Sequence, residues 1–312
     1  MKTARFLLIL VGLLVAVGLI VMAVHGQGQA AARKELERRG LQFNEQAFIE
    51  SARKGDKEAV KLFLAAGMSV DTRGRDSENS TVLMVAAMAG QTEVLRILIA
   101  GGADINAKTT KGRTALSWAA WSGNTSTALD LIASAGDINV ADNSGATPLS
   151  FAISHHKTNT ARALLDEGAA ANVQNKQGYS PLMYAVVGGH ADISRALLVK
   201  GADPNAADLH KRSVLMLATI AEDANAVKML LENHADVNSA DELGRTALMI
   251  AAEKKNAKIV QLLVSRGASV NATDRNSRTA LTRAEQRGQT EIEDMLRAKG
   301  AVSNSTAPGR WP

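Results

Sequence analysis

A period of 33 residues runs through most of this chain and limits what it can fold into. Thr or Ser recurs seven times at that spacing, each followed two positions later by Leu, and further columns are Ala or Asn in every unit. Self-similarity at a fixed period of about 20–50 residues indicates stacked units that bury their apolar faces against their neighbours. The three columns are Thr81, Thr114, Thr147, Ser180, Ser213, Thr246 and Thr279; Ala86, Ala119, Ala152, Ala185, Ala218, Ala251 and Ala284; and Asn106, Asn139, Asn172, Asn205, Asn238, Asn271 and Asn304.

Each unit has the pattern of two short helices followed by a turn. In one unit the Thr147 hydroxyl can cap a helix whose first residue is Pro148, where a missing N–H does no harm. Gly168 supplies the positive φ that ends the second helix.

Hydrophobic residues make up 46% of the chain but aromatic residues only 3%, so most of the apolar side chains are aliphatic. This composition suits closely packed helices and disfavours an aromatic-rich β-sandwich.

Short motifs recur at equivalent positions, among them GATPLSFA, GYSPLMYA, GADPNA and HADVNSA. These motifs resemble ankyrin repeats, and the resemblance covers residues 43–301. It implies an all-α solenoid of about eight helix-turn-helix units with connecting hairpins, the first hairpin lengthened over residues 71–79. The His of the family's Thr-Pro-Leu-His motif, which the resemblance implies to link neighbouring repeats, never occurs. We expect packing by flexible methionines to replace it at four positions: Met84, Met183, Met216 and Met249.

An uninterrupted apolar run covers residues 6–24. As a helix rising about 1.5 Å per residue, it would be roughly 28 Å long, which matches the hydrocarbon core of a bilayer. We predict an uncleaved transmembrane anchor within residues 1–25. A cleaved signal segment and a buried globular helix are the alternatives, and the run is long for a signal peptide.

The basic residues beside the apolar run predict its orientation. Lys2 and Arg5 adjoin it directly, whereas the first basic residue on the other side is Arg33. We expect a single-pass protein with its repeats on the non-cytoplasmic side, periplasmic or extracellular. The opposite topology stays open, because Arg33 lies within the range over which such charges act. A cleaved segment would instead give a secreted or periplasmic protein.

The predicted organisation is an anchor or signal at residues 1–25, a polar linker at 26–42, the repeat domain at 43–302 and a tail at 303–312. The formal net charge of +5 is not spread evenly. Residues 1–39 carry six Lys and Arg against two Glu, and the remainder carries 30 basic against 29 acidic residues. A nearly neutral array is poor evidence for a nucleic-acid partner, so we expect none.

No pattern in the chain indicates catalysis, a cofactor or a metal. The absence of Cys excludes disulfides, thiolate nucleophiles and Cys-ligated zinc. No phosphate-binding loop, HExxH or GxSxG motif occurs. The histidines occupy repeat positions, so we expect no metal site, no cofactor and no small-molecule substrate. An enzyme with unrecognised catalysis is the alternative, for which the sequence outside the repeats leaves little room.

The resemblance implies that a protein partner contacts outward positions of the hairpins and first helices. Along the array, one such helix column is mostly apolar in its first five members, and exposed apolar stripes and Trp mark interfaces. Trp118, Phe151 and Tyr184 recur at a framework position and are expected in the core. The candidate partner-binding residues are Met88, Trp121, His155, Tyr179, Val187 and Ile220.

Two charged features have structural interpretations. An Arg before the Thr of several units, as in Arg212 and Arg245, is expected to pair with turn Asp residues of neighbouring repeats. In the last unit, polar residues that include Arg283, Gln286 and Glu291 are expected to form a solvent-facing cap.

Overall fold

The computed structural model describes residues 26–303, which divide into two units between Asp137 and Ile138. The apolar run at residues 6–24, predicted as an anchor, and the tail from residue 304 lie outside the described residues. Between residues 26 and 303, no helix combines the length and apolar character needed to cross a bilayer.

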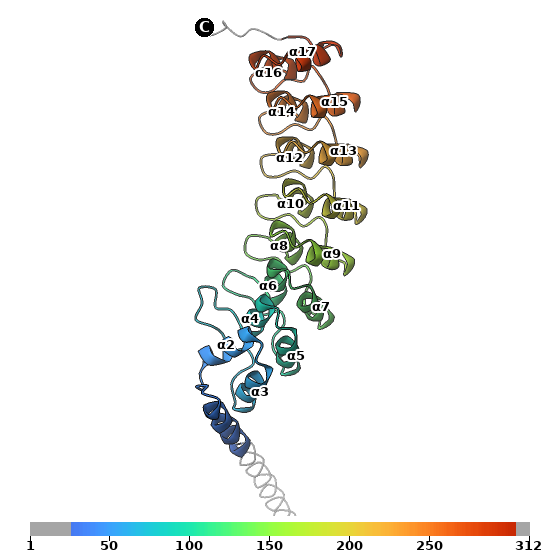
Figure 1. Ribbon diagram of the computed structural model, residues 1–312. Helices are drawn as coiled ribbons and strands as arrows, with labels where there is room; N and C mark the ends of the chain where they lie inside the picture. The colour runs from blue at the N-terminus through green and yellow to red at the C-terminus, as the bar shows by residue number, and fades with distance from the viewer. Residues whose placement is uncertain (1–25, 304–312) are drawn as a thin grey trace, which may run out of the picture. The chain divides into compact units, whose positions relative to one another are not determined.

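The amino-terminal unit, which ends at Asp137, contains three helix pairs (Figure 1). Its first helices α2, α4 and α6 pack against one another in order, and α3, α5 and α7 form a second layer. The helices are α2 (Glu45–Lys54), α3 (Lys57–Ala65), α4 (Val82–Ala89), α5 (Thr92–Ala100), α6 (Ala115–Ser122) and α7 (Thr125–Ala133).

The carboxy-terminal unit, which begins at Ile138, repeats this arrangement in five further pairs. The even-numbered helices stack in one layer and the odd-numbered helices in the other (Figure 1). They are α8 (Pro148–Ser154), α9 (Thr158–Asp166), α10 (Pro181–Val187), α11 (Ala191–Val199), α12 (Val214–Ile220), α13 (Ala224–Glu232), α14 (Ala247–Glu253), α15 (Ala257–Ser265), α16 (Ala280–Gln286) and α17 (Thr290–Arg297).

The repeat columns account for this stacking. Each Thr or Ser of the first column caps a first helix by accepting a hydrogen bond from the N–H three residues later, as Thr147 does from Ser150 at 3.3 Å. Every residue of the Ala column is fully buried, so neighbouring helices approach too closely for a larger side chain. The four methionines that replace the family's His are also buried, as predicted.

The Asn column links consecutive repeats, a role the sequence analysis did not assign. The side chain of Asn172 donates to the Gly201 carbonyl at 2.8 Å and accepts from the Asp203 N–H at 2.8 Å. The same two-sided bond recurs at Asn106, Asn205, Asn238 and Asn271. Each of these Asn side chains therefore connects its repeat to the next through both its amide N–H and its carbonyl oxygen.

Residues 26–38 are helical, which differs from the polar linker predicted for residues 26–42. Leu36 is fully buried, and the Arg33 guanidinium lies 4.3 Å from the centre of the Phe43 ring. Its Nε also donates to the carbonyl of Ala66, directly after α3. The segment therefore packs on the first repeat, because one buried Leu and a cation–π contact hold an otherwise polar helix in place.

The hairpin arginines form ion pairs, and Arg113 does so with Glu78 of the neighbouring hairpin, but three others have partners that differ from those predicted. Arg212, Arg245 and Arg278 each pair with an Asp four residues earlier in the same hairpin, not in a neighbouring repeat. Arg283 also differs from the expectation. Its side chain is only 7% exposed, although a solvent-facing cap was predicted. It lies between Asp274 and Glu253, each at 2.6 Å, so this part of the cap is a buried ion-pair network.

Candidate partner-binding surface

In the amino-terminal unit, the structure brings two predicted site residues onto neighbouring helices. Met88 lies in the last turn of α4 and Trp121 in the last turn of α6. Trp121 is 38% exposed, and its ring meets that of Trp118 edge-to-face at 5.8 Å. Edge-to-face packing holds an aromatic side chain in one orientation while leaving apolar surface accessible.

Beside this tryptophan pair is a pocket of about 220 Å³. Its apolar lining comes from Met84, Val85 and Met88 of α4 and from Trp118 of α6, and Arg53 and the first hairpin contribute polar groups. Trp118 was expected in the core but is only partly buried. Sequence reasoning missed it as a site residue because its column, which also holds Val85, Leu217 and Ile250, matches a framework position. A tryptophan in that column was the signal available.

An ion-pair cluster holds the hairpin that contributes to this pocket. The Glu78 side chain, 10% exposed, lies 3.0 Å from Lys111 Nζ and 3.2 Å from Arg113 Nη1 of the next hairpin. Thr109 Oγ1 lies 3.4 Å from the same carboxylate. Because the carboxylate is largely removed from water, taking away its basic partners would cost more than breaking a surface ion pair.

The carboxy-terminal unit holds the other four predicted residues. Val187 and Ile220 end α10 and α12, and are 52% and 36% exposed. His155 follows α8 and is also exposed, with Nδ1 3.0 Å from the Phe151 carbonyl oxygen. Val187, Ile220 and His155 are therefore accessible, as a role in partner binding requires.

Tyr179 is less available than the sequence indicated. Its ring packs 5.5 Å from that of Tyr184, and its hydroxyl accepts a 3.4 Å hydrogen bond from Arg212. Tyr184 was expected in the core but is half-buried, and its hydroxyl accepts a hydrogen bond from the Asn175 amide. Burial raises the pKa of the Tyr184 hydroxyl above its ordinary value. The two tyrosines therefore brace the hairpin and leave one part of Tyr179 exposed.

Sequence reasoning also missed two apolar residues in the hairpins. Leu209 is 70% exposed and Leu243 51% exposed. Between them along the chain, His210 Nδ1 approaches Glu242 Oε1 of the following hairpin. The available signal was a single Leu in each of two otherwise polar turns, because reversing turns favour Gly, Asn, Asp and Ser.

The histidines form a pair but not a metal-ligand cluster. His156 Nδ1 lies 2.9 Å from His190 Nε2, and burial followed by the neighbouring His156 lowers the pKa of His190. Throughout the described residues 26–303, no group of three His, Asp or Glu side chains is placed to hold a metal ion.

A family model describing three copies of the ankyrin repeat matches residues 21–109, 48–142, 116–208 and 215–307. These matches together cover most of the chain. The chain belongs to the ankyrin-repeat family. Its helix pairs, Ala column and inter-repeat Asn bonds are the structural counterpart of that match.

Two curated proteins share short ankyrin-like stretches with this chain. Human "Ankyrin repeat domain-containing protein 29" is 48% identical over 56 residues, 18% of each chain. "Delta-latroinsectotoxin-Lt1a" from Latrodectus tredecimguttatus is 40% identical over 60 residues, 19% of this chain and 5% of the toxin. The chain thus spans less than one fifth of either relative, and the likeness concerns the repeats alone.

The candidate surface consists of the exposed ends of the first helix of each repeat, together with the hairpins. Apolar and aromatic side chains on this surface are bordered by charged groups, as in many protein-binding surfaces. Such repeats suggest a role in protein–protein interaction.

Proposed function

We propose that this protein is a non-enzymatic adaptor that binds a protein partner through the first helices and hairpins of its ankyrin repeats. The observation that carries this proposal is the tryptophan pair on α6 beside the 220 Å³ pocket on α4. A partly exposed Trp next to a concave apolar pocket matches the composition of binding hot spots, where aromatic anchors dominate the free energy of association.

Replacing Trp121 by Ala is expected to weaken binding of the partner by roughly 30-fold or more, the loss expected for an aromatic hot spot. The partner is first recovered from native membranes with tagged full-length protein, and its dissociation constant is then measured. Trp121→Ala combined with Tyr179→Ala should weaken binding further if the partner reaches both units.

Val199→Ala is the matched control, because Val199 is 85% exposed but lies at the end of α11 in the second-helix layer. It should leave the dissociation constant unchanged. Unaltered binding by the Trp121→Ala, Tyr179→Ala double variant would exclude the proposed surface.

We further propose that residues 6–24 tether the protein to a membrane, with the repeats on the non-cytoplasmic side. The support is the length of the apolar run and the basic residues Lys2 and Arg5 before it. We expect the full-length chain to stay in the membrane pellet after an alkaline carbonate wash. Release of a shortened chain into the supernatant would instead favour a cleaved signal and a soluble exported protein.

A further inference from the structure

The pocket beside the tryptophan pair lies where one repeat column has its smallest side chain. Val85 lines this pocket, together with Met84 and Met88 of α4 and Trp118 of α6. Phe151, two units later in the column of Val85, is only 8% exposed, so an aromatic ring fits inside the packed array at this position. The other members of the column are also larger than Val: Trp118, Tyr184, Leu217, Ile250 and Arg283. The unit of Val85 therefore lacks a ring that a later unit supplies from its own chain.

The volume of the pocket suits one side chain. Pockets for drug-sized ligands usually measure about 300–1,000 Å³, whereas a cavity on the order of 150 Å³ holds a benzene-sized group. At about 220 Å³, this pocket accommodates one aromatic side chain. Its walls also favour a ring over an aliphatic chain, because Trp118 and the thioethers of Met84 and Met88 make favourable contacts with aromatic rings.

The charged side chains around the pocket are already bound within the chain. The Glu78 carboxylate is held by the two basic residues of the next hairpin. Arg53 Nη1 lies 3.2 Å from Glu50 Oε2, and the Asp76 carboxylate accepts from two backbone N–H groups. A charged group that entered the pocket would lose water without gaining a free partner, so the lining selects an uncharged side chain.

One main-chain donor beside the pocket is open. Backbone hydrogen bonds join other consecutive hairpins, as from the N–H of Thr110 to the Glu78 carbonyl at 3.0 Å. Asp76 accepts from the N–H groups two and four residues later, as Thr109 does in the next hairpin, which makes Ser77 the counterpart of the residue after Thr109. Ser77 lines the pocket, and its N–H has no hydrogen-bond acceptor among residues 26–303. An open main-chain donor next to an apolar pocket favours a peptide, which brings a carbonyl group and a side chain together.

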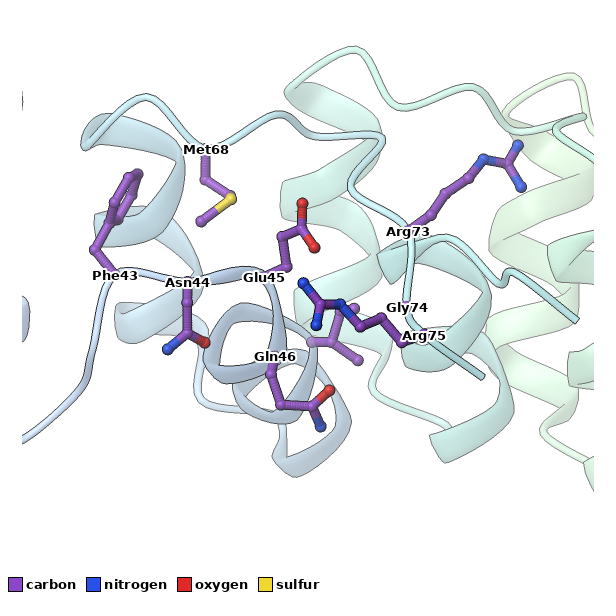
Figure 2. A pocket seen from close by; sticks show the side chains of 9 residues that line it. Phe43, Asn44, Glu45, Gln46, Met68, Arg73, Gly74 and Arg75 are labelled. Carbon is purple, nitrogen blue, oxygen red and sulfur yellow. The ribbon is translucent and has the colours of Figure 1, made fainter. Parts of the chain in front are cut away.

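A larger hollow of about 610 Å³ lies between the start of α2 and another part of the first hairpin (Figure 2). Phe43, Ile49 and Met68 supply apolar lining. Figure 2 shows the Arg75 side chain reaching toward the start of α2, where Glu45 also lies. Because Arg75 and Glu45 are both exposed, this lining presents charges of both signs and matches an uncharged ring less well than the smaller pocket does.

We propose that an extended segment of a partner protein inserts one aromatic side chain, such as that of Phe, into the pocket beside Val85. A carbonyl group of the same segment accepts a hydrogen bond from the Ser77 N–H. Main-chain pairing combined with a pocket for one side chain is the general mode of strand addition. The proposal rests on the proposed role in protein binding and specifies the chemical group that the pocket beside the tryptophan pair recognises.

The test uses full-length protein in nanodiscs of zwitterionic lipid and a fluorescent peptide of Ser and Thr with one central Phe, with binding followed by fluorescence anisotropy against empty nanodiscs. We expect saturable binding, and a dissociation constant roughly tenfold or more higher for the matched peptide with central Ala, because the ring is the main apolar surface buried. Peptides with central Asp or Lys should bind no better than the Ala peptide. Equal binding of the Phe and Ala peptides, tighter binding of a charged peptide, or no saturable binding would overturn the proposal.

Val85→Phe fills the pocket with the side chain that a later unit carries in the same column. It should fold, because Phe151 is buried in that column, and should raise the dissociation constant of the Phe peptide roughly tenfold or more. Leu217→Phe places the same side chain in the same column of the carboxy-terminal unit, and should leave the constant within about twofold. Melting curves followed by circular dichroism verify that both variants fold. Undiminished binding by folded Val85→Phe protein would overturn the proposal.

The backbone donor can be removed with little effect on the turn. Asn79 N–H donates to the Asp76 carbonyl at 3.2 Å, so Ser77 is the second residue of this turn, a position that favours Pro. Ser77→Pro removes the N–H and should raise the dissociation constant roughly fivefold, the effect of one net hydrogen bond, whereas Ser77→Ala retains the donor and should bind normally. Equal binding by these two variants would overturn the main-chain contact.

Two comparisons locate the peptide and separate this proposal from the proposed function. Arg75→Ala alters the larger hollow and should leave peptide binding unchanged; a loss in this variant without a loss in Val85→Phe would place the peptide in the wrong cavity and overturn the proposal. If Trp121→Ala weakens capture of the natural partner but the Phe peptide does not bind, the protein-binding surface stands and the aromatic anchor fails. Selective binding of the Phe peptide with unaltered partner capture by Trp121→Ala would uphold the pocket and exclude the proposed partner surface.

Discussion

Replacing Asp274 by Ala is expected to lower the free energy of unfolding of the last repeat by about 3–5 kcal/mol. The Asp274 carboxylate is 1% exposed and accepts from backbone N–H groups in its own turn. It also lies 3.0 Å from Arg278 Nε and 2.6 Å from Arg283 Nη2. Its loss leaves the buried Arg283 charge with only Glu253. Chemical denaturation followed by circular dichroism measures the change.

Asp241→Ala is the matched control, because Asp241 occupies the equivalent position one repeat earlier. Its partner Arg245 is 32% exposed and can turn toward water when the carboxylate is removed. We expect a smaller loss of about 1–2 kcal/mol, mainly from the hairpin hydrogen bonds. Equal losses for the two variants would show that the Arg283 network contributes nothing beyond the turn itself.

The same carboxylate predicts how stability depends on pH. Burial by itself would raise the pKa of Asp274, but backbone hydrogen bonds from Arg278 and Asn276 and the two guanidinium groups outweigh burial and hold the pKa below its ordinary value. Folding therefore favours the ionised form. The stabilisation is complete above the unfolded carboxyl pKa of about 4 and is lost as pH falls through the lower folded value. Asp274→Asn should flatten this acid dependence.

Replacing Phe63 by Ala is expected to destabilise the amino-terminal unit by about 3–5 kcal/mol, since it empties a large volume in a packed core. Phe63 is fully buried in α3, with the Phe48 ring centre at 5.4 Å and that of Phe43 at 6.2 Å. Denaturant unfolding, with hydrogen exchange to locate the loss, provides the measurement. Exchange should accelerate in residues 43–66 far more than in the carboxy-terminal unit.

Phe63→Leu is the control for this cavity. Leu retains most of the apolar volume, so a smaller loss of about 1–2 kcal/mol is expected. A loss as large as that of Phe63→Ala would mean that the aromatic contacts, rather than the filled volume, hold the three rings together. A negligible loss in both variants would contradict the assignment of Phe63 to the core.

Much of the fold was predictable because each packing requirement recurs seven times in the sequence, once in each repeat unit. The fully buried Ala column and the capping hydroxyls follow from local rules, and these rules hold in every unit. The candidate site was predictable only in part. Trp121, Val187 and Ile220 are exposed as expected, whereas Tyr179 is braced by Tyr184 and Arg212 and Trp118 contributes to a pocket.

By itself, the sequence determined the period, the helix boundaries and the columns that face the interior, because spacing and side-chain type decide these locally. Only the tertiary structure decided which charges pair, that Arg283 is buried, and that residues 26–38 pack as a helix on the first repeat. The physical reason is that charge pairing and burial depend on what lies one repeat away in space, which a column of similar residues does not specify.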